Sequence, residues 1–204
     1  VLSGRCFVHE ALAYNAFDEI VEALSHWLRQ LSDAARAAIL PVDFTALTRL
    51  FPALREAGLP ESASDASPAP AGLGERTRAF RALHQLLERM SLEQALVLHV
   101  DDLQWADADS QALLRELLED PVPRLCVLVT VRSDAAQTEP IAALLTAYER
   151  LALGPLSEHA VRALAATELA DCPQALLGSI ARESAGHPLL AKELIAHARR
   201  THMA

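Results

Sequence analysis

The chain has 204 residues, of which 51% are hydrophobic, so it can form one domain with a core, and its composition excludes a disordered chain. Its formal net charge of −9 argues against direct nucleic-acid binding by this segment, because such binding requires a basic surface. Three widely spaced cysteines argue against a disulfide framework and favour a reducing, cytoplasmic location. The sequence contains no apolar run of about 18 residues, the length that would predict a membrane span.

The first 57 residues predict a short strand followed by helices. Residues 1–6 are expected to form the strand, in which Gly4 allows a neighbouring element to approach closely. Apolar residues at helical spacing predict a long helix over residues 11–31, and Ser32–Asp33 is expected to end it and to cap the next helix. Further helical pieces are predicted over residues 33–40, 43–50 and 52–57.

Residues 58–74 are small, polar and rich in proline, unlike the segments on either side. We interpret them as a mobile surface loop inserted within one domain, because the helices that flank the loop have no sheet of their own. An amphipathic helix is predicted over residues 75–90, directly before the next apolar run.

The most informative feature is an apolar run, residues 95–100, that ends in Asp101 and Asp102. Such a run predicts a fully buried strand in a parallel sheet, and open α/β sheets place ligands at the carboxyl ends of their strands. Asp101 is then expected to hold Mg²⁺, while Asp102, facing the other way along the backbone, is expected to orient an attacking water. The alternative is that both residues form a turn or cap a helix.

The residues around this pair have simpler explanations. His99 is expected to be a hydrogen-bonded core histidine, and Trp105 is expected to pack where a helix meets a strand rather than to touch a ligand. Asp109 or Ser110 is expected to cap a helix that runs through Leu118.

A second apolar run, residues 125–131, ends in Arg132. In a parallel sheet this arginine would lie near the same edge as Asp101, where its planar guanidinium can bind a terminal phosphate. The alternative is a solvated arginine at a strand end.

After Arg132 the chain is expected to form one more helix and one more strand before it becomes entirely helical. Pro140 is expected to open a helix through about Tyr148, and residues 150–153 to form a further short strand. Strands that alternate with helices predict an α/β fold with a parallel sheet. The expected domains are therefore an α/β core over residues 1–154 and a helical lid over residues 155–204.

Within the lid, Ser157 and Pro173 are expected to start helices, and Gly186-His187-Pro188 separates the last two. A glycine that ends one helix and a proline that sets the first turn of the next explain this tripeptide without any function. The functional interpretation is that Pro188 packs on a nucleotide base.

The chain contains no G-x-x-x-x-G-K-[ST] string, whose backbone amides and lysine bind phosphates in P-loop proteins. Its single lysine, Lys192, lies in the last predicted helix with no glycine-rich loop before it.

Together these motifs resemble the AAA-like ATPase module of bacterial signal-transduction ATPases with numerous domains (STAND). Such modules occur in large LuxR-type transcription regulators and in kinase and cyclase fusions. Residues 97–107, which resemble the Walker B segment of that family, are the most specific match. The other matching segments are residues 2–6 (second strand), 14–17 (following helix), 129–133 (sensor strand), 153–157 (entry to the lid) and 183–189 (Gly-x-Pro lid motif).

The resemblance implies a partial P-loop NTPase followed by a small helical lid, with ATP and Mg²⁺ as cofactors. It implies that Asp101 binds Mg²⁺, Asp102 activates water and Arg132 senses phosphate. Gly186 and Pro188 would form the nucleotide-binding lid motif, in which Pro188 contacts adenine.

The departure from the family lies at the amino-terminal end. In the family the first strand, the P-loop and its helix precede the segment matched by residues 2–6, and that first strand lies between the sensor strand and the last strand. Because the chain begins with Val1 rather than Met, we expect it to be a piece of a longer protein. It is then expected to have a gapped sheet and half of a nucleotide site.

Three functional hypotheses follow. The first is an ATP-dependent regulatory switch in signalling or transcription, whose partners are ATP or ADP, the P-loop segment and downstream sensor or output domains. The fragment itself is then expected to bind ATP weakly or not at all and to be inactive. The second is a non-enzymatic protein-interaction module that has lost the P-loop, and the third is a Mg²⁺-dependent phosphohydrolase that uses Asp101 and Asp102.

Overall fold

The computed structural model describes residues 1–8, 13–57, 73–137, 139–169 and 172–202. The chain divides into two compact units, Val1–Tyr148 and Glu149–Ala204. The expected boundary at 154/155 lies inside the second unit.

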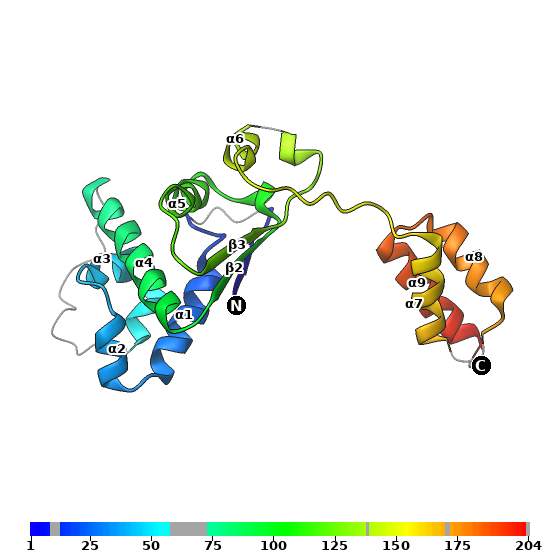
Figure 1. The fold of residues 1–204 in the computed structure, drawn as a ribbon, viewed down its shortest axis with the longest axis horizontal. Helices are drawn as coiled ribbons and strands as arrows, with labels where there is room; N and C mark the ends of the chain where they lie inside the picture. The colour runs from blue at the N-terminus through cyan, green and yellow to red at the C-terminus, as the bar shows by residue number, and fades with distance from the viewer. Residues whose placement is uncertain (9–12, 58–72, 138, 170–171, 203–204) are drawn as a thin grey trace. The chain divides into compact units, whose positions relative to one another are not determined.

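The first unit is built on a parallel sheet of three strands (Figure 1). The strands are β1 (Leu2–Arg5), β2 (Leu96–Asp101) and β3 (Leu125–Val129), in the order β1-β2-β3. The register aligns Arg5 with Asp101 and Val100 with Val129, so the carboxyl ends of all three strands lie at one edge of the sheet. This arrangement confirms the α/β fold with a parallel sheet.

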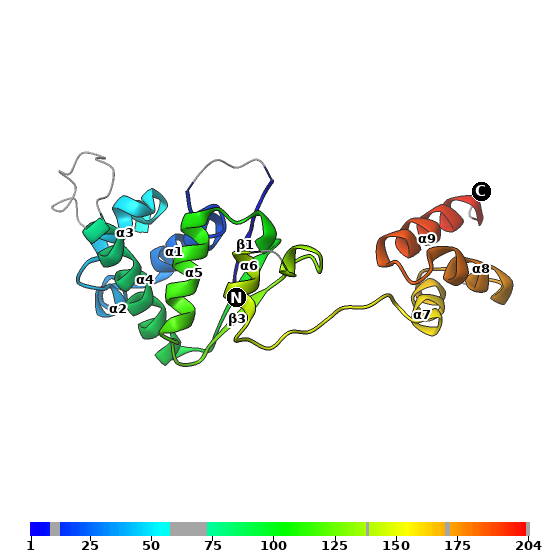
Figure 2. The same ribbon diagram turned by 90° about the horizontal axis from the view of Figure 1, so that it is seen from above.

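Helices cover one face of this sheet (Figure 2). The first unit contains helices α1 (Asp18–Gln30), α2 (Asp33–Ile39), α3 (Phe44–Leu50), α4 (Leu73–Glu93), α5 (Ala108–Glu119) and α6 (Ile141–Leu145), with 3₁₀ turns η1 (Pro52–Ala57), η3 (Leu103–Trp105) and η4 (Ala135–Gln137). Leu98 and Val100 of β2 share a buried core with Leu24 of α1 and Leu86 of α4. Burial of this apolar surface is the main stabilisation of the unit.

Gly4 brings β1 and α1 together, as expected. A Cβ atom at this position would lie 2.6 Å from the carbonyl oxygen of Ala16, just before α1. A larger residue would therefore force the strand away from the helix.

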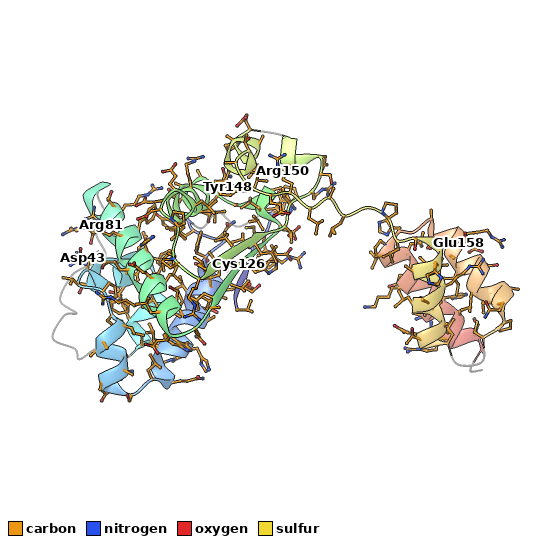
Figure 3. The ribbon with its side chains drawn as sticks, viewed as in Figure 1. Asp43, Arg81, Cys126, Tyr148, Arg150 and Glu158 are labelled. Atoms are coloured by element: carbon orange, nitrogen blue, oxygen red, sulfur yellow. The ribbon has the colours of Figure 1, made fainter. Side chains whose placement is uncertain are left out.

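The expectation that β2 is fully buried is wrong. Leu96, Leu98 and Val100 are buried, but Val97 and His99 on the other face are only half-buried. On β3 the same open face carries Cys126, which Figure 3 labels, and Leu128, which is 53% exposed. Within the described residues, helices cover only one face of the sheet, so an apolar run here marks a central strand without full burial.

The strand expected over residues 150–153 is not formed either. Leu151 and Leu153 are 85% and 88% exposed, and no described strand pairs with the segment. A strand requires a hydrogen-bonded neighbour, so strand-like composition was insufficient here. The expected gap lay between β3 and residues 150–153. Because residues 150–153 form no strand, the sheet of the described residues ends at β3 instead of continuing beyond a gap.

Several helix boundaries differ from those expected. Of the helix expected over residues 11–31, residues 11 and 12 lie outside the described residues, and the observed helix begins at Asp18. Tyr14 has a φ of 67°, which excludes a helix at that position. The helix expected to reach Tyr148 ends at Leu145. Of the expected 58–74 loop, Leu73 and Gly74 belong to α4, and residues 58–72 lie outside the described residues.

The second unit consists of helices α7 (Glu158–Glu168), α8 (Gln174–Ser184) and α9 (Pro188–His202). They enclose a small core that includes Val161, Ile180 and Ile195. Ser157 caps α7 by accepting a hydrogen bond from the Ala160 amide at 3.1 Å, as predicted. No helix in the described part of the chain is long and apolar enough to cross a membrane.

Candidate functional site

Asp101 and Asp102 lie at the carboxyl end of the central strand. β2 ends at Asp101, and Asp102 adopts left-handed backbone angles (φ 58°, ψ 42°) before η3 begins. This conformation breaks the alternation of side chains along the strand. The expectation that the two carboxylates face opposite ways is therefore wrong, because both of them approach the guanidinium of Arg5.

Arg5, at the end of β1, is the site residue that sequence reasoning missed. Its Nη2 and Nε donate to Asp102 Oδ2 at 2.7 and 3.0 Å, and its Nε lies 3.7 Å from Asp101 Oδ2. The parallel register that pairs Arg5 with Asp101 explains the contact. The signal in the sequence was a basic residue at the end of the first strand. Only the pairing of β1 with β2 shows that this residue lies beside the two carboxylates.

Thr130, directly after β3, holds Asp101 and Asp102 from the strand opposite to that of Arg5. Its hydroxyl donates to Asp101 Oδ1 and accepts from the Asp102 amide, the latter at 3.0 Å. Its carbonyl accepts from the Leu103 amide at 2.9 Å, and Leu103 is fully buried. The turn that carries both carboxylates is thus attached to the end of β3 by backbone and side chain.

Gln104 joins Asp102 to Arg132. Its Nε2 donates to Asp102 Oδ1 at 2.9 Å, and its Oε1 accepts from the backbone amide of Arg132 at 3.1 Å. The pKa of Asp102 lies below its ordinary value, because Gln104 and then Arg5 donate hydrogen bonds to its ionised form. The structure therefore brings Arg132 to the same edge of the sheet as the carboxylate pair.

The guanidinium of Arg132 is turned toward a different acid. Its Nε and Nη2 lie 3.2 Å from the two carboxylate oxygens of Asp134. Hydrogen bonds from Arg132 lower the pKa of this exposed carboxyl. Arg132 must exchange Asp134 for phosphate oxygens if it is to bind a phosphate.

Asp107 caps α5 in place of Asp109 or Ser110, the residues expected from sequence. One carboxylate oxygen accepts from the amides of Asp109 and Ser110, both at 2.9 Å, and the other accepts from the Asn15 amide at 2.9 Å. Burial opposes ionisation of Asp107, but the hydrogen bonds from Ser110, Tyr14 and Asn15 outweigh it and lower the pKa. The helix starts earlier than expected, at Ala108, so Asp107, the residue directly before it, takes the capping position.

Two neighbouring residues take no part in the carboxylate cluster. The side chain of His99 is hydrogen-bonded to the Ser3 hydroxyl at 2.9 Å on the open face of the sheet, so it is bonded as expected but only half-buried. Trp105 is 40% exposed. In the described part of the chain no three His, Cys, Asp or Glu side chains cluster as a metal site.

Gly186 and Pro188 belong to the second unit, where they form the junction between α8 and α9. Gly186 has a φ of 77°, and its carbonyl accepts from the Leu156 amide at 2.8 Å. A Cβ at Gly186 would lie 2.3 Å from the Leu156 carbonyl oxygen, so only glycine fits. Pro188 is exposed and begins α9. The structural explanation of this tripeptide is therefore correct, and its role toward a nucleotide stays a prediction.

The comparisons identify one family. The family model described as an AAA ATPase domain matches residues 1–129, which include the whole three-stranded sheet and the carboxylate pair. Arg132, Gly186 and Pro188 lie outside the matched residues. No curated protein and no solved structure matched the chain.

Proposed function

The chain belongs to the AAA ATPase domain family, and from this premise we propose that it forms the Walker B and sensor half of an ATP-dependent regulatory switch. The observation that carries the proposal is the cluster at the carboxyl edge of the sheet. There, Asp101 and Asp102 lie between Arg5 and Thr130, and Gln104 joins Asp102 to the backbone of Arg132. Carboxylates and a cation at this edge fit a site for a charged ligand.

In this proposal the oxygen atoms of the cluster would hold a magnesium ion. Mg²⁺ prefers oxygen ligands and is usually held by one or two carboxylates together with substrate phosphates. Asp101, with help from the Thr130 hydroxyl that already touches it, would hold the ion. The bound ion would neutralise charge on the phosphates of ATP.

Each remaining residue then has a proposed task. Asp102, whose lowered pKa keeps it ionised, would accept a hydrogen bond from the attacking water. Arg132 would leave Asp134 and bind the terminal phosphate, and Gly186 and Pro188 would bring the lid to the adenine. ATP and ADP would differ in whether Arg132 has a phosphate to bind, which gives the switch its two states.

The phosphate-binding loop would come from another segment, because the 204 residues contain no G-x-x-x-x-G-K-[ST] string. We propose that sensor or output domains of the same polypeptide respond to the switch, as in LuxR-type regulators of signalling and transcription. Hydrolysis would be slow and would reset the switch.

Calorimetry tests whether the phosphate-binding loop of the site comes from a segment other than this chain. We expect this chain to bind ATP with Mg²⁺ weakly or not at all, since the loop that binds phosphates is supplied elsewhere. A micromolar affinity would contradict that origin of the loop. A polypeptide that joins this chain to a segment carrying the string should bind ATP, and failure of that polypeptide to bind would overturn the proposed function.

Two other functions are separated by simple observations. A reading frame upstream of the Val1 codon that encodes Gly-Lys-Ser/Thr favours the switch, whereas an initiator codon at that point favours an interaction module. A metal-dependent phosphatase activity lost in Asp101→Ala would favour a phosphohydrolase. A phosphohydrolase would need a further carboxylate as a metal ligand, and the candidate on the neighbouring strand end is Asp134. This acid is paired with Arg132.

A further inference from the structure

The side-chain amide of Gln104 has both of its ends occupied. Its Nε2 donates to Asp102 Oδ1 at 2.9 Å, and its Oε1 accepts from the Arg132 amide at 3.1 Å. The two partners lie on different strand ends, after β2 and after β3. One half-buried side chain thus spans the edge of the sheet where the carboxylates meet the sensor strand.

The two hydrogen bonds require the same orientation of the Gln104 side-chain amide. If the amide were flipped, its oxygen would face the Asp102 carboxylate and its NH₂ group would face the Arg132 N–H, so both contacts would become repulsive. A charged acceptor also strengthens a hydrogen bond, and chained hydrogen bonds polarise one another. Each bond of Gln104 therefore helps to hold the other.

The backbone of Gln104 is held independently of this amide. The Leu103 amide donates to the Thr130 carbonyl at 2.9 Å, and the Trp105 amide donates to the Asp102 carbonyl at 2.9 Å. The fully buried Leu103 side chain anchors the same turn. Removing the amide should leave the turn in place, so its effect on Arg132 can be measured separately from folding.

We propose that Gln104 is a positioning residue that couples the Asp102 carboxylate to the backbone of Arg132. Asp134 holds the guanidinium of Arg132, while Gln104 holds its backbone. The charged groups paired with the two partners of the bridge are Arg5, which lies near both Asp101 and Asp102, and Asp134, which is paired with Arg132. The catalytic meaning of the coupling rests on the proposed function, since it would keep the water-orienting acid and the phosphate-binding arginine in register.

The test measures solvent exchange of the Arg132 amide proton by NMR on the whole chain. Gln104→Met removes both hydrogen bonds and keeps the length of the side chain, so the exchange should become roughly three- to tenfold faster, as expected for one lost hydrogen bond. The Leu103 amide should keep its protection, which shows that the turn is intact. Unchanged exchange of Arg132 with Leu103 still protected would overturn the proposal.

A second glutamine supplies the matched control. Gln111 also donates from Nε2 to a backbone carbonyl in this region, that of Ala106 at 2.9 Å. Gln111→Met should leave the exchange of Arg132 unchanged. Equal acceleration by both variants would show general loosening and would contradict a specific bridge.

A double-mutant cycle tests the coupling itself. Asp102→Ala removes one anchor of the Gln104 amide and should accelerate exchange at Arg132, although Asp102 does not touch that proton. In the Gln104→Met background the same substitution should add little. Additive effects would show that Asp102 acts on Arg132 by another route and would overturn the proposal.

Kinetics separate this inference from the proposed function. In a polypeptide that hydrolyses ATP, Gln104→Met should lower kcat more than it raises KM, because it displaces the water-orienting acid relative to the phosphate-binding arginine and leaves the rest of the nucleotide site unchanged. Absence of any nucleotide binding would overturn the proposed function and leave the exchange results standing. An unchanged kcat would overturn the catalytic meaning of the bridge.

Discussion

Asn15 and Asp107 hold each other reciprocally across 92 positions of sequence. The Asn15 amide donates to Asp107 Oδ2 at 2.9 Å, and the Asp107 amide donates back to Asn15 Oδ1 at 3.4 Å. Asn15 is buried and also donates from Nδ2 to the Trp105 carbonyl at 3.3 Å. The segment that leads into α1 is thereby fastened to the turn that follows the carboxylate pair.

Asp107→Ala should destabilise the first unit. The substitution removes the cap of α5 and leaves the buried Asn15 without one of its partners, so we expect a loss of about 1–3 kcal/mol. Urea unfolding followed by circular dichroism measures it. Asp43→Ala is the control, because Asp43 precedes α3 without a side-chain capping bond and should cost much less.

The same carboxyl predicts a pH dependence of stability. Its pKa is lower in the folded chain than the value of about 4 expected for an unfolded chain. The contribution of Asp107 to folding stability is therefore fully present above the pKa of the unfolded chain, and it is lost as the pH falls through the pKa of the folded chain. Between neutral and acidic pH, Asp107→Asn should lose less stability than the native chain; equal losses in both would contradict the assignment.

Gly186→Ala should destabilise the second unit by more than about 1 kcal/mol. The added Cβ would meet the Leu156 carbonyl oxygen, and the φ of 77° is unfavourable for alanine. Gly154→Ala is a matched control in the same unit, since a Cβ there meets nothing within 4 Å. Thermal unfolding should distinguish the two variants, and equal melting temperatures would show that the junction does not require glycine.

Arg5→Met should raise the pKa of Asp102 toward its ordinary value. Gln104 contributes most to the lowered pKa, so the variant should shift it only part of the way. A carbon-detected NMR titration of the Asp102 carboxyl measures the shift. Arg29→Met, which removes an exposed pair with Glu56, should have no effect on Asp102.

Hydrolysis tests the roles of the two acids. In a polypeptide that supplies the phosphate-binding loop, Asp102→Asn should lower kcat roughly 100-fold or more and leave ATP binding in place. Asp101→Ala should weaken the dependence on Mg²⁺ instead. If Asp102→Asn hydrolyses ATP at the native rate, the proposed role of Asp102 is wrong.

The sequence alone determined the parts that depend on local pattern. All three sheet strands were predicted, two of them from apolar runs and the first over residues 1–6. Helical spacing predicted most helices, and Ser32 and Ser157 cap helices as predicted. It also placed Asp101 and Arg132 at one edge of the sheet, because parallel strands end on the same side. Periodicity and capping are properties of neighbouring residues, so a single sequence reveals them.

The tertiary structure decided which distant groups meet. The contact of Arg5 with Asp102, the bridge through Gln104 and the contact of Asn15 with Asp107 join residues through strand register and through left-handed backbone angles at Tyr14 and Asp102. The failure of residues 150–153 to form a strand has the same origin, since a strand exists only beside a partner. Hydrogen bonds between segments depend on where the whole chain places its backbone, and no local pattern encodes that position.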